Sequence, residues 1–258
     1  MHDDGACILC GTTLRVAAAD AHRERALCPC CGVNARLRGV ILGVLRAVAA
    51  DPLRPLRTLP PRREIRAVGI SDHPACAAAF AEAFDYTNTF FHCDPLLDIC
   101  DAAAAARFGG CDLVVCSDVI EHTLRPPAVT ITNLLAMLRP GGALVLSAPT
   151  FRIPATIEWY GGVTGFTIAR EAEGFAVHWT DLRGQTLIDR RPIFHGGPGT
   201  VLEMRVIAAD DLLDVARRLA ASVEVLAFAP AWGYAWRFVR EFPYLDGEDD
   251  GRILILRR

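Results

Sequence analysis

Short apolar runs alternate with segments of helical spacing between residues 65 and 147. The clearest run is Cys111–Ser117, whose apolar residues occupy successive positions, as expected of a strand buried on both faces inside a parallel sheet. Alternation of such strands with helices predicts βαβ units, and hence an α/β fold with a doubly wound, mostly parallel sheet. The other predicted elements of this stretch are strands Ile65–Ile70, Tyr86–Cys93, Leu96–Cys100 and Ala143–Ser147, and helices Pro74–Phe84 and Val129–Leu138.

The flanking segments divide the chain into three predicted parts. These are a cysteine-rich segment over 1–34, a helix with a Pro-rich connector over 35–63, and the core over 64–258. Residues 151–193 break the strand–helix rhythm and are predicted to form an insertion in the core. Further predicted elements are a helix over 35–50, strands Val201–Ile207 and Val223–Phe228, the helix Asp210–Ala221, and a final strand or aromatic wall containing Trp232, Tyr234, Trp236 and Phe238.

Five of the ten cysteines lie within the first 31 residues. Cys7 and Cys10 form one C-x2-C pair. Cys28 and Cys31 form a second pair after seventeen intervening residues, and Cys30 is a spare. Two such pairs can complete a tetrahedral zinc shell, and the spacing is typical of zinc ribbons. Four thiolates leave no open position for a substrate, so the sequence predicts a structural Zn²⁺.

Charge and composition exclude several classes of function. The chain has 258 residues, 27 basic against 30 acidic, and its net charge of −3 argues against a general polyanion binder. Every basic residue is Arg, so Schiff-base chemistry on a lysine is excluded. The acidic first residues are followed by no apolar stretch, and no run is long enough for a membrane span, so we expect a cytoplasmic protein with reduced thiols.

Several motifs follow one another at the predicted strand ends. Ser117-Asp118-Val119-Ile120-Glu121-His122 follows the buried strand, Leu138-Arg139-Pro140-Gly141-Gly142 follows the next helix, and Ser147-Ala148-Pro149 ends the strand after it. This ordered set resembles class I S-adenosylmethionine-dependent methyltransferases. The N-terminal cysteines and the Phe194–Arg205 segment resemble one bacterial branch, in which a zinc ribbon precedes the core. The resemblance covers roughly residues 5–40 and 64–206.

The resemblance implies S-adenosylmethionine as cofactor and gives roles to residues at the strand ends. The family's first motif is a Gly-rich turn, whereas this chain has a single glycine there, Gly69. Asp72 is expected at the amino group of the cofactor, Asp94 at the ribose and Asp101 at the adenine amine; the alternative for each is a helix N-cap or a loop carboxylate. The full predicted cofactor-binding set is Gly69, Ser71, Asp72, Asp94, Asp101, Ser117 and Asp118.

Asp118, Glu121 and His122 are spaced i, i+3, i+4 and would lie on one face of a helix. Their oxygen and nitrogen atoms suit a divalent cation such as Mg²⁺, and the string is similar to a metal-serving motif of ubiquinone-pathway O-methyltransferases. The alternative is that Glu121 caps a helix and His122 packs against the cofactor. In either case these three residues are expected to lie near the methyl donor.

Methyl transfer to a hydroxyl needs a proton acceptor, and without lysine this is a histidine or a carboxylate. The candidate catalytic residues are His122, His178, His195 and Glu158, the last as a group that binds the acceptor's hydroxyl. Each histidine can instead have an ordinary structural role. His195 is favoured by the Gly-rich residues that follow it, which are typical of a loop close to a ligand.

Three functions follow from this sequence. The first is methylation of an oxygen atom of a small molecule or saccharide, with residues 151–193 forming a lid over this acceptor. The second is RNA methylation with the ribbon as docking module, suggested by a local basic cluster of Arg15, Arg23, Arg25, Arg36 and Arg38. The third is a non-methylating use of the cofactor, or a scaffold. We expect a small-molecule partner rather than nucleic acid or a membrane; a homodimer and a monomer both stay open.

Overall fold

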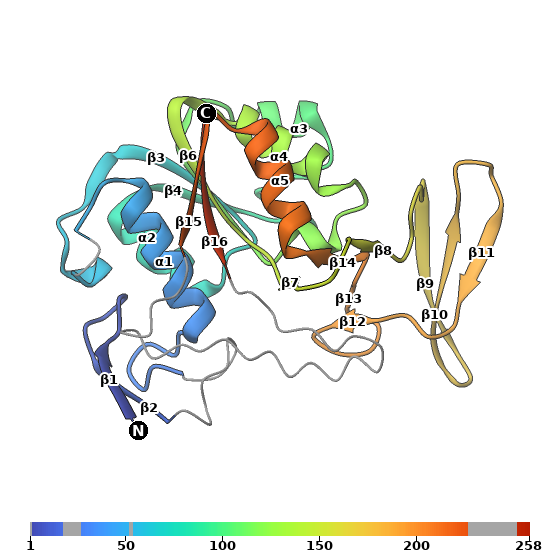
Figure 1. Ribbon diagram of the computed structural model, residues 1–258, viewed down its shortest axis with the longest axis horizontal. Coiled ribbons are helices and arrows are strands. Elements are labelled where there is room, and N and C mark those ends of the chain that lie inside the picture. Colours follow the sequence, from blue (N-terminus) through green and yellow to red (C-terminus); the bar gives the residue numbers. More distant parts are fainter. Residues whose placement is uncertain (1, 18–26, 52–53, 227–251) are drawn as a thin grey trace.

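The computed structural model describes residues 2–17, 27–51, 54–226 and 252–258. A six-stranded sheet with strand order β15–β16–β6–β5–β3–β4 forms its centre (Figure 1). The four strands from β4 to β6 in this order are parallel, and β16 runs antiparallel to both of its neighbours. The predicted fold class, a doubly wound and mostly parallel α/β sheet, is confirmed. The strands are β3 (Arg62–Ile70), β4 (Phe84–Thr89), β5 (Cys111–Ser117), β6 (Leu138–Ser147), β15 (Ser222–Leu226) and β16 (Ile253–Arg257).

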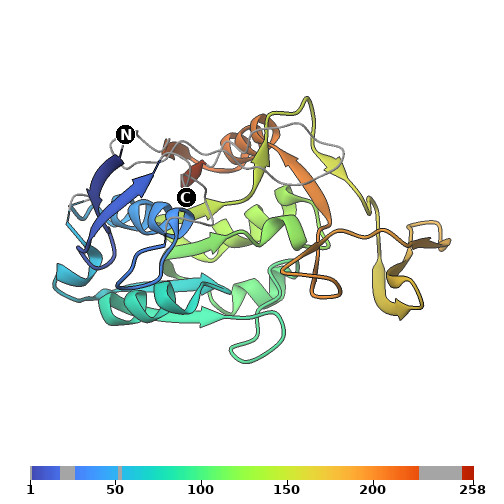
Figure 2. The same cartoon turned by 90° about the horizontal axis from the view of Figure 1, so that it is seen from below.

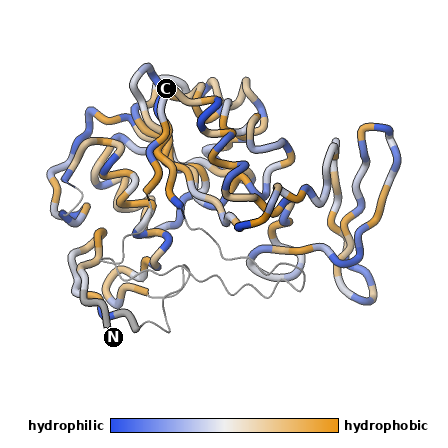
Figure 3. The backbone as a smooth tube through the Cα atoms, in the orientation of Figure 1, coloured by the Kyte–Doolittle hydropathy of each residue, from blue (hydrophilic) through white to orange (hydrophobic). Residues whose placement is uncertain are grey.

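Helices cover both faces of the sheet. Leu113 and Val115 of β5 belong to the core under α1 and α2, whereas Val114 and Cys116 belong to the core on the opposite face, under α4 and α5. Successive residues of β5 therefore bury their side chains on opposite sides, which is why the run from Leu113 to Cys116 is apolar without a break. The central strands are correspondingly hydrophobic in Figure 3. The helices are α1 (Ala35–Ala47), α2 (Pro74–Ala83), α3 (Ala102–Ala106), α4 (Pro127–Ala136) and α5 (Ala209–Leu219).

The cysteine-rich segment packs against the first of these cores. It contains the hairpin of β1 (His2–Ala6) and β2 (Thr13–Ala17). Ile8 and Leu9 are buried in the same core as α1, and their carbonyls accept from the backbone of the connector's 3₁₀ helix η2 (Leu56–Thr58). The segment is therefore joined to the sheet by both apolar contacts and backbone hydrogen bonds.

The predicted insertion forms small sheets of its own. β9 (Gly165–Glu171), β10 (Gly174–Thr180) and β11 (Thr186–Asp189) make an antiparallel sheet that extends away from the central sheet (Figures 1 and 2). The predicted strand Val201–Ile207 is divided between two sheets. The remaining strands are β7 (Thr150–Phe151), β8 (Ile157–Glu158), β12 (Phe194–His195), β13 (Val201–Leu202) and β14 (Arg205–Ala208).

Two expectations differ from the structure at the sheet edges. The predicted strand Leu96–Cys100 is wrong: only a bridge joins Phe90 to Leu96, and the side chain of Asp98 accepts from the backbone of Cys100 at 2.8 Å, which closes a turn instead. Strand β16 was not predicted. The predicted aromatic strand or wall at 232–238, the end of the Val223–Phe228 strand, Arg23 and Arg25 lie outside the described residues.

None of the helices in the described part of the chain is long and apolar enough to span a bilayer.

Candidate functional site

The parallel strands β3, β5 and β6 end at one edge of the sheet, where several polar residues follow them. Ser71 follows β3, while Ser117 and Ser147 end β5 and β6. Ser71 and Asp118 have positive φ angles of 55° and 52°, a left-handed conformation that non-glycine residues seldom adopt. Ligands bind at this edge in doubly wound sheets, and backbone strain of this kind concentrates at functional sites. This edge is therefore the candidate site.

Asp72 is a buried carboxyl group beside the first strand end. Its side chain accepts a hydrogen bond from the Tyr86 hydroxyl at 2.7 Å, and its backbone N–H donates to the side chain of Asn88 at 2.9 Å. Burial raises the pKa of Asp72 to about 7, although the Tyr86 hydrogen bond and the charge of Arg36 oppose the rise. A Cβ atom on Gly69 would lie 2.0 Å from the Tyr86 hydroxyl oxygen. Glycine at 69 thus makes room for the Tyr86–Asp72 pair.

Replacing Asp72 by asparagine is expected to stabilise the protein at high pH and to have little effect near pH 4. The pKa of Asp72 is raised in the folded state, so its folding contribution is favourable at low pH and is lost as pH rises toward about 7. The full penalty above that pH is on the order of 4 kcal/mol. Urea unfolding of both proteins from pH 4 to pH 8 measures it; a difference independent of pH would contradict the raised pKa.

Arg36 reaches the same edge from the beginning of α1. Its Nη1 donates to the Ser117 hydroxyl at 2.9 Å, and its Nε lies 3.1 Å from Oδ2 of Asp118. The Ser147 hydroxyl lies 2.9 Å from that of Ser117 and 3.2 Å from Oδ1 of Asp118. The structure therefore brings the predicted residues Ser117 and Asp118 together with an arginine that the sequence analysis had placed only in a basic cluster.

His122 lies beyond Asp118, at the end of the 3₁₀ helix η3 (Ile120–His122). Its Nδ1 is 3.0 Å from the carbonyl oxygen of Leu202. A carbonyl only accepts, so this contact places the ring proton on Nδ1 and leaves the lone pair on Nε2. Burial lowers the pKa of His122, although the charge of Glu203 opposes this, so the imidazole is neutral around pH 7. A neutral imidazole with a fixed tautomer can accept a proton at Nε2.

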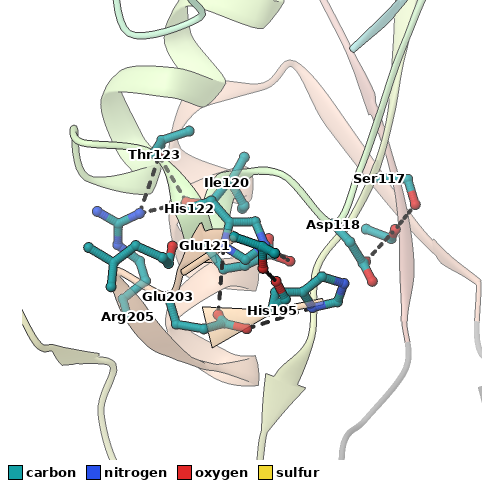
Figure 4. Close-up of polar contacts among 12 residues, drawn as sticks. Ser117, Asp118, Ile120, Glu121, His122, Thr123, His195, Glu203 and Arg205 are labelled. Atoms are coloured by element: carbon teal, nitrogen blue, oxygen red, sulfur yellow. Dashed lines mark hydrogen bonds and ion pairs between the residues drawn. The ribbon is translucent and has the colours of Figure 1, made fainter. Parts of the chain in front are cut away.

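His195 and Glu203 complete a cluster with His122. The Glu203 side chain is 3% exposed, and its carboxylate oxygens lie 3.9 Å from Nδ1 of His122 and 3.8 Å from Nδ1 of His195. The two rings face each other edge-on with centroids 5.4 Å apart, and the His195 side chain is 49% exposed (Figure 4). The cluster thus joins a buried carboxylate to one enclosed and one accessible imidazole. Glu203 was not predicted.

The predicted cation ligands Asp118, Glu121 and His122 are not brought together as a set. Asp118 precedes η3 in a left-handed conformation and pairs with Arg36, so it does not share a helical face with the other two. Glu121 is buried, with Oε1 3.6 Å from Nε2 of His122. Among the described residues at this edge, the group that could hold a cation is His122, His195 and Glu203, whose ligand atoms all lie within 4.8 Å of one another. Such a nitrogen-rich set suits transition-metal ions better than Mg²⁺.

The other two predicted catalytic residues have different partners. Glu158 accepts from Nε of Arg205 at 2.8 and 3.1 Å, and the buried guanidinium also donates to the carbonyl of Ile120 at 2.6 Å. Glu158 therefore neutralises an arginine that is hydrogen-bonded to the first residue of η3. His178 lies on β10, with Nε2 3.5 Å from a carboxylate oxygen of Glu171 on the neighbouring strand. Its contacts belong to the inserted sheet and not to the His122 cluster.

Asp94 and Asp101 lie at exposed positions near the end of β4. Asp101 is the N-cap of α3 and accepts from the backbone of Ala103 at 2.8 Å, the alternative that the sequence left open. Asp94 lies in the exposed loop that follows β4. The structure brings neither of them into contact with the cluster of Asp72, Arg36 and Asp118.

The four predicted zinc ligands lie together at the N-terminal segment. Sγ of Cys7 is 3.6 Å from that of Cys31, and the same distance separates Cys10 from Cys28. A tetrahedral Zn²⁺ with bonds of about 2.3 Å places sulfurs about 3.8 Å apart, so the four residues fit the ion. Both knuckles have the same backbone pattern, in which Gly11 and Gly32 donate to the carbonyls of Cys7 and Cys28 at 2.7 and 2.9 Å. The spare residue, Cys30, is exposed and lies outside the tetrahedron.

The basic cluster that suggested RNA binding is not a single exposed surface. Arg38 is buried and donates to the carbonyl of Val33, and Arg36 is directed to the strand ends. Of the described members, Arg15 is exposed. The arginines that follow the second knuckle therefore serve contacts inside the protein, which weakens the RNA hypothesis.

Comparisons with known proteins identify similar folds only. No family model matches the chain, and neither does any curated protein sequence. Among solved structures, Streptomyces venezuelae DesVI is 12% identical over 85% of this chain and 93% of its own, with a TM-score of 0.43. An S-adenosylmethionine-dependent methyltransferase from Mesorhizobium loti is 17% identical over 79% and 95%, with a TM-score of 0.39. The CcbJ methyltransferase from Streptomyces caelestis is 14% identical over 86% and 95%, with a TM-score of 0.38.

Proposed function

We propose that the protein transfers a methyl group from S-adenosylmethionine to a hydroxyl group of a small molecule or saccharide. The observation that carries the proposal is the neutral imidazole of His122, a few residues beyond the strand end formed by Ser117 and Asp118. A proton acceptor is thereby held next to the edge at which doubly wound sheets bind their ligands. The motifs of the sequence support the choice of cofactor.

The residues at the edge fit the cofactor that the motifs imply. Asp72 and Asp118 are largely buried carboxyl groups suited to an α-ammonium group, and the hydroxyls of Ser71 and Ser117 can take further hydrogen bonds. Asp94 is proposed to bind the ribose, and Asp101, in addition to capping α3, is proposed to accept from the adenine amine. When bound, S-adenosylmethionine supplies a methyl group on a positively charged sulfur. The protein's task is then to hold the acceptor in line with it and to take its proton.

The proton acceptor is proposed to be His122. With Nδ1–H held by the carbonyl of Leu202, Nε2 would be free to accept the proton that the acceptor's hydroxyl loses when it is methylated. The imidazolium that forms is stabilised by the buried carboxylates of Glu121 and Glu203 on either side. His195, exposed on the rim of the same cluster, is proposed to carry the proton onward to solvent.

A divalent cation is a second proposed aid to this reaction. It would be held by His122, His195 and Glu203, with the lone pair of His122 binding the ion instead of accepting a proton, and it would lower the pKa of the acceptor's hydroxyl. Turnover that rises with added Mn²⁺ or Mg²⁺ and falls with a chelator too weak to remove the ribbon zinc would support the cation-assisted form. Turnover unaffected by either treatment would leave the proton transfer to His122 alone.

The inserted sheet is proposed to form the lid over the acceptor. Val177 of β10 packs with Leu202 and Met204, close to the residues that bear the imidazole cluster. Large apolar side chains are exposed along the insertion, including Trp159, Phe166, Leu182 and Ile188. Apolar and aromatic surface of this kind can pack against the rings of a small organic acceptor or a sugar.

Calorimetric titration with S-adenosylhomocysteine tests the cofactor. Saturable binding of one ligand per chain is expected, because the strand-end residues match its charged and polar groups. Transfer of label from S-adenosylmethionine into a cell extract then identifies the acceptor. Absence of binding at millimolar ligand would eliminate both the methyltransferase and any other use of this cofactor, and would leave a scaffold. Binding without methyl transfer would point to the non-methylating reaction.

A further inference from the structure

Arg36 is connected to the zinc ribbon through only a few residues. The last predicted zinc ligand is Cys31, and the helix α1 begins after the N-cap residue Asn34, whose side chain accepts from the backbone of Leu37 at 2.9 Å. Arg38 ties the turn between them by donating to the carbonyl of Val33 at 2.8 Å. The metal site, the N-cap and the first turn of α1 therefore form one unit, and this unit sets the position of Arg36.

The guanidinium group of Arg36 is largely withdrawn from water. Its side chain is 16% exposed and that of its partner Asp118 is 8% exposed. Ion pairs with so little exposure contribute little net stability, because desolvation offsets much of their attraction. The left-handed backbone of Asp118 adds a further cost. Such an arrangement is better explained by ligand binding than by stability.

The charges at this point alternate over a short distance. Arg36 contacts Asp118 directly and also acts electrostatically on the carboxyl group of Asp72. A positive group paired with one carboxyl group and acting on a second is complementary to a zwitterion, because the ammonium group of an α-amino acid needs acceptors and its carboxylate needs donors. The planar guanidinium is especially suited to a carboxylate, which it can bind through two parallel hydrogen bonds.

We propose that Arg36 binds the α-carboxylate of the cofactor's methionine moiety, so that the helix positioned by the cysteine cluster supplies part of the cofactor site. This inference rests on the proposed function, since it assigns a residue to the same cofactor. It goes beyond the proposed function because it gives α1, and the cysteine cluster that positions this helix, a part in cofactor affinity. Arg36 lies 81 residues before Ser117 in the sequence. In this proposal Arg36 contacts the amino-acid moiety of the cofactor and not its adenosine moiety.

The test compares two ligands that differ in the amino-acid moiety. S-Adenosylhomocysteine carries it, whereas 5′-methylthioadenosine has the same thioether and nucleoside without it. In Arg36→Gln we expect the affinity for S-adenosylhomocysteine to fall about 10- to 100-fold, the loss of a charge-assisted hydrogen-bond pair, with the affinity for methylthioadenosine unchanged. Arg36→Lys keeps the charge without the fork and should lose less.

Arg46→Gln is the matched control. Arg46 lies on the same helix and also forms an ion pair, with Glu224, but this pair is exposed at the far end of α1. Its removal should change neither affinity. An unchanged ratio of the two affinities in Arg36→Gln, whether both fall or neither does, would overturn the proposal. Wild-type protein that binds neither ligand would refute the proposed function itself. If the wild type binds both ligands, the proposed cofactor stands, and the variant then tests only the role of Arg36.

Discussion

Replacing Cys28 by serine is expected to abolish zinc binding and to unfold the N-terminal segment. Structural zinc sites of this type contribute apparent binding free energies of about 10–16 kcal/mol, which is as large as the whole stability of a typical domain. The apolar side chains of Ile8 and Leu9 in this segment are buried against the core of the sheet. Loss of the metal should therefore also lower the melting temperature of the whole protein.

Cys30→Ser is the control for this experiment. Cys30 is exposed and lies outside the group of four thiols, although it belongs to the same Cys-Pro-Cys-Cys run. Metal analysis should find about one zinc per chain in the wild type and in Cys30→Ser, and none in Cys28→Ser. A zinc-free wild-type protein with an undiminished melting temperature would refute the ribbon.

Replacing His122 by asparagine is expected to lower turnover by about 10²- to 10⁴-fold, the usual contribution of a general base. The amide N–H of asparagine can still donate to the carbonyl of Leu202, so the substitution removes mainly the acceptor at Nε2. Because burial lowers the pKa of His122, wild-type turnover should fall only at a pH below the usual range of histidine. This acidic limb of the profile should disappear in the variant.

The matched control is His73→Asn. His73 is exposed and caps α2 by accepting from the backbone of Ala75, a role that asparagine performs equally well. Turnover and its pH profile should therefore be those of the wild type. If His122→Asn also keeps the wild-type turnover, or keeps the acidic limb, His122 is not the base and the proposed proton transfer is wrong.

Much of the central sheet was predictable because its strands are buried on both faces. Such strands are uninterrupted apolar runs, and Cys111–Ser117 has the same bounds in the structure as in the prediction. Strand β16 was missed although Ile253–Leu256 is entirely apolar. A single short apolar run cannot be told from other buried segments by periodicity alone, and the aromatic residues at 232–238 were taken for the final strand instead. The antiparallel placement of β16 between β6 and β15 depends on pairing across the sheet.

The candidate site was predicted in part. Ser117, Asp118 and His122 were found because they directly follow a predicted strand, and strand ends are where such sheets bind ligands. Glu203 was missed because it follows no long strand, and from the Phe194–Arg205 segment that contains it only His195 was chosen as a candidate. Glu203 reaches His122 through backbone hydrogen bonds such as that from Met204 to the carbonyl of Glu121, which join distant parts of the chain. The predicted cation ligands assumed that Asp118 shares a helical face with Glu121 and His122. The left-handed backbone at Asp118 places this residue outside the helix.

The sequence by itself determined the elements whose signal is local. The apolar runs specify the strands of the sheet, and the spacing of Cys7, Cys10, Cys28 and Cys31 specifies a four-thiol cluster, because a C-x2-C turn brings two sulfurs together on its own. Only the tertiary structure decided which charged and titratable side chains meet. Arg36 finds Asp118, and His122 finds Glu203, across about eighty residues in each case. Such contacts have no period in the sequence, since they depend on how the ribbon, the sheet and the insertion pack against one another.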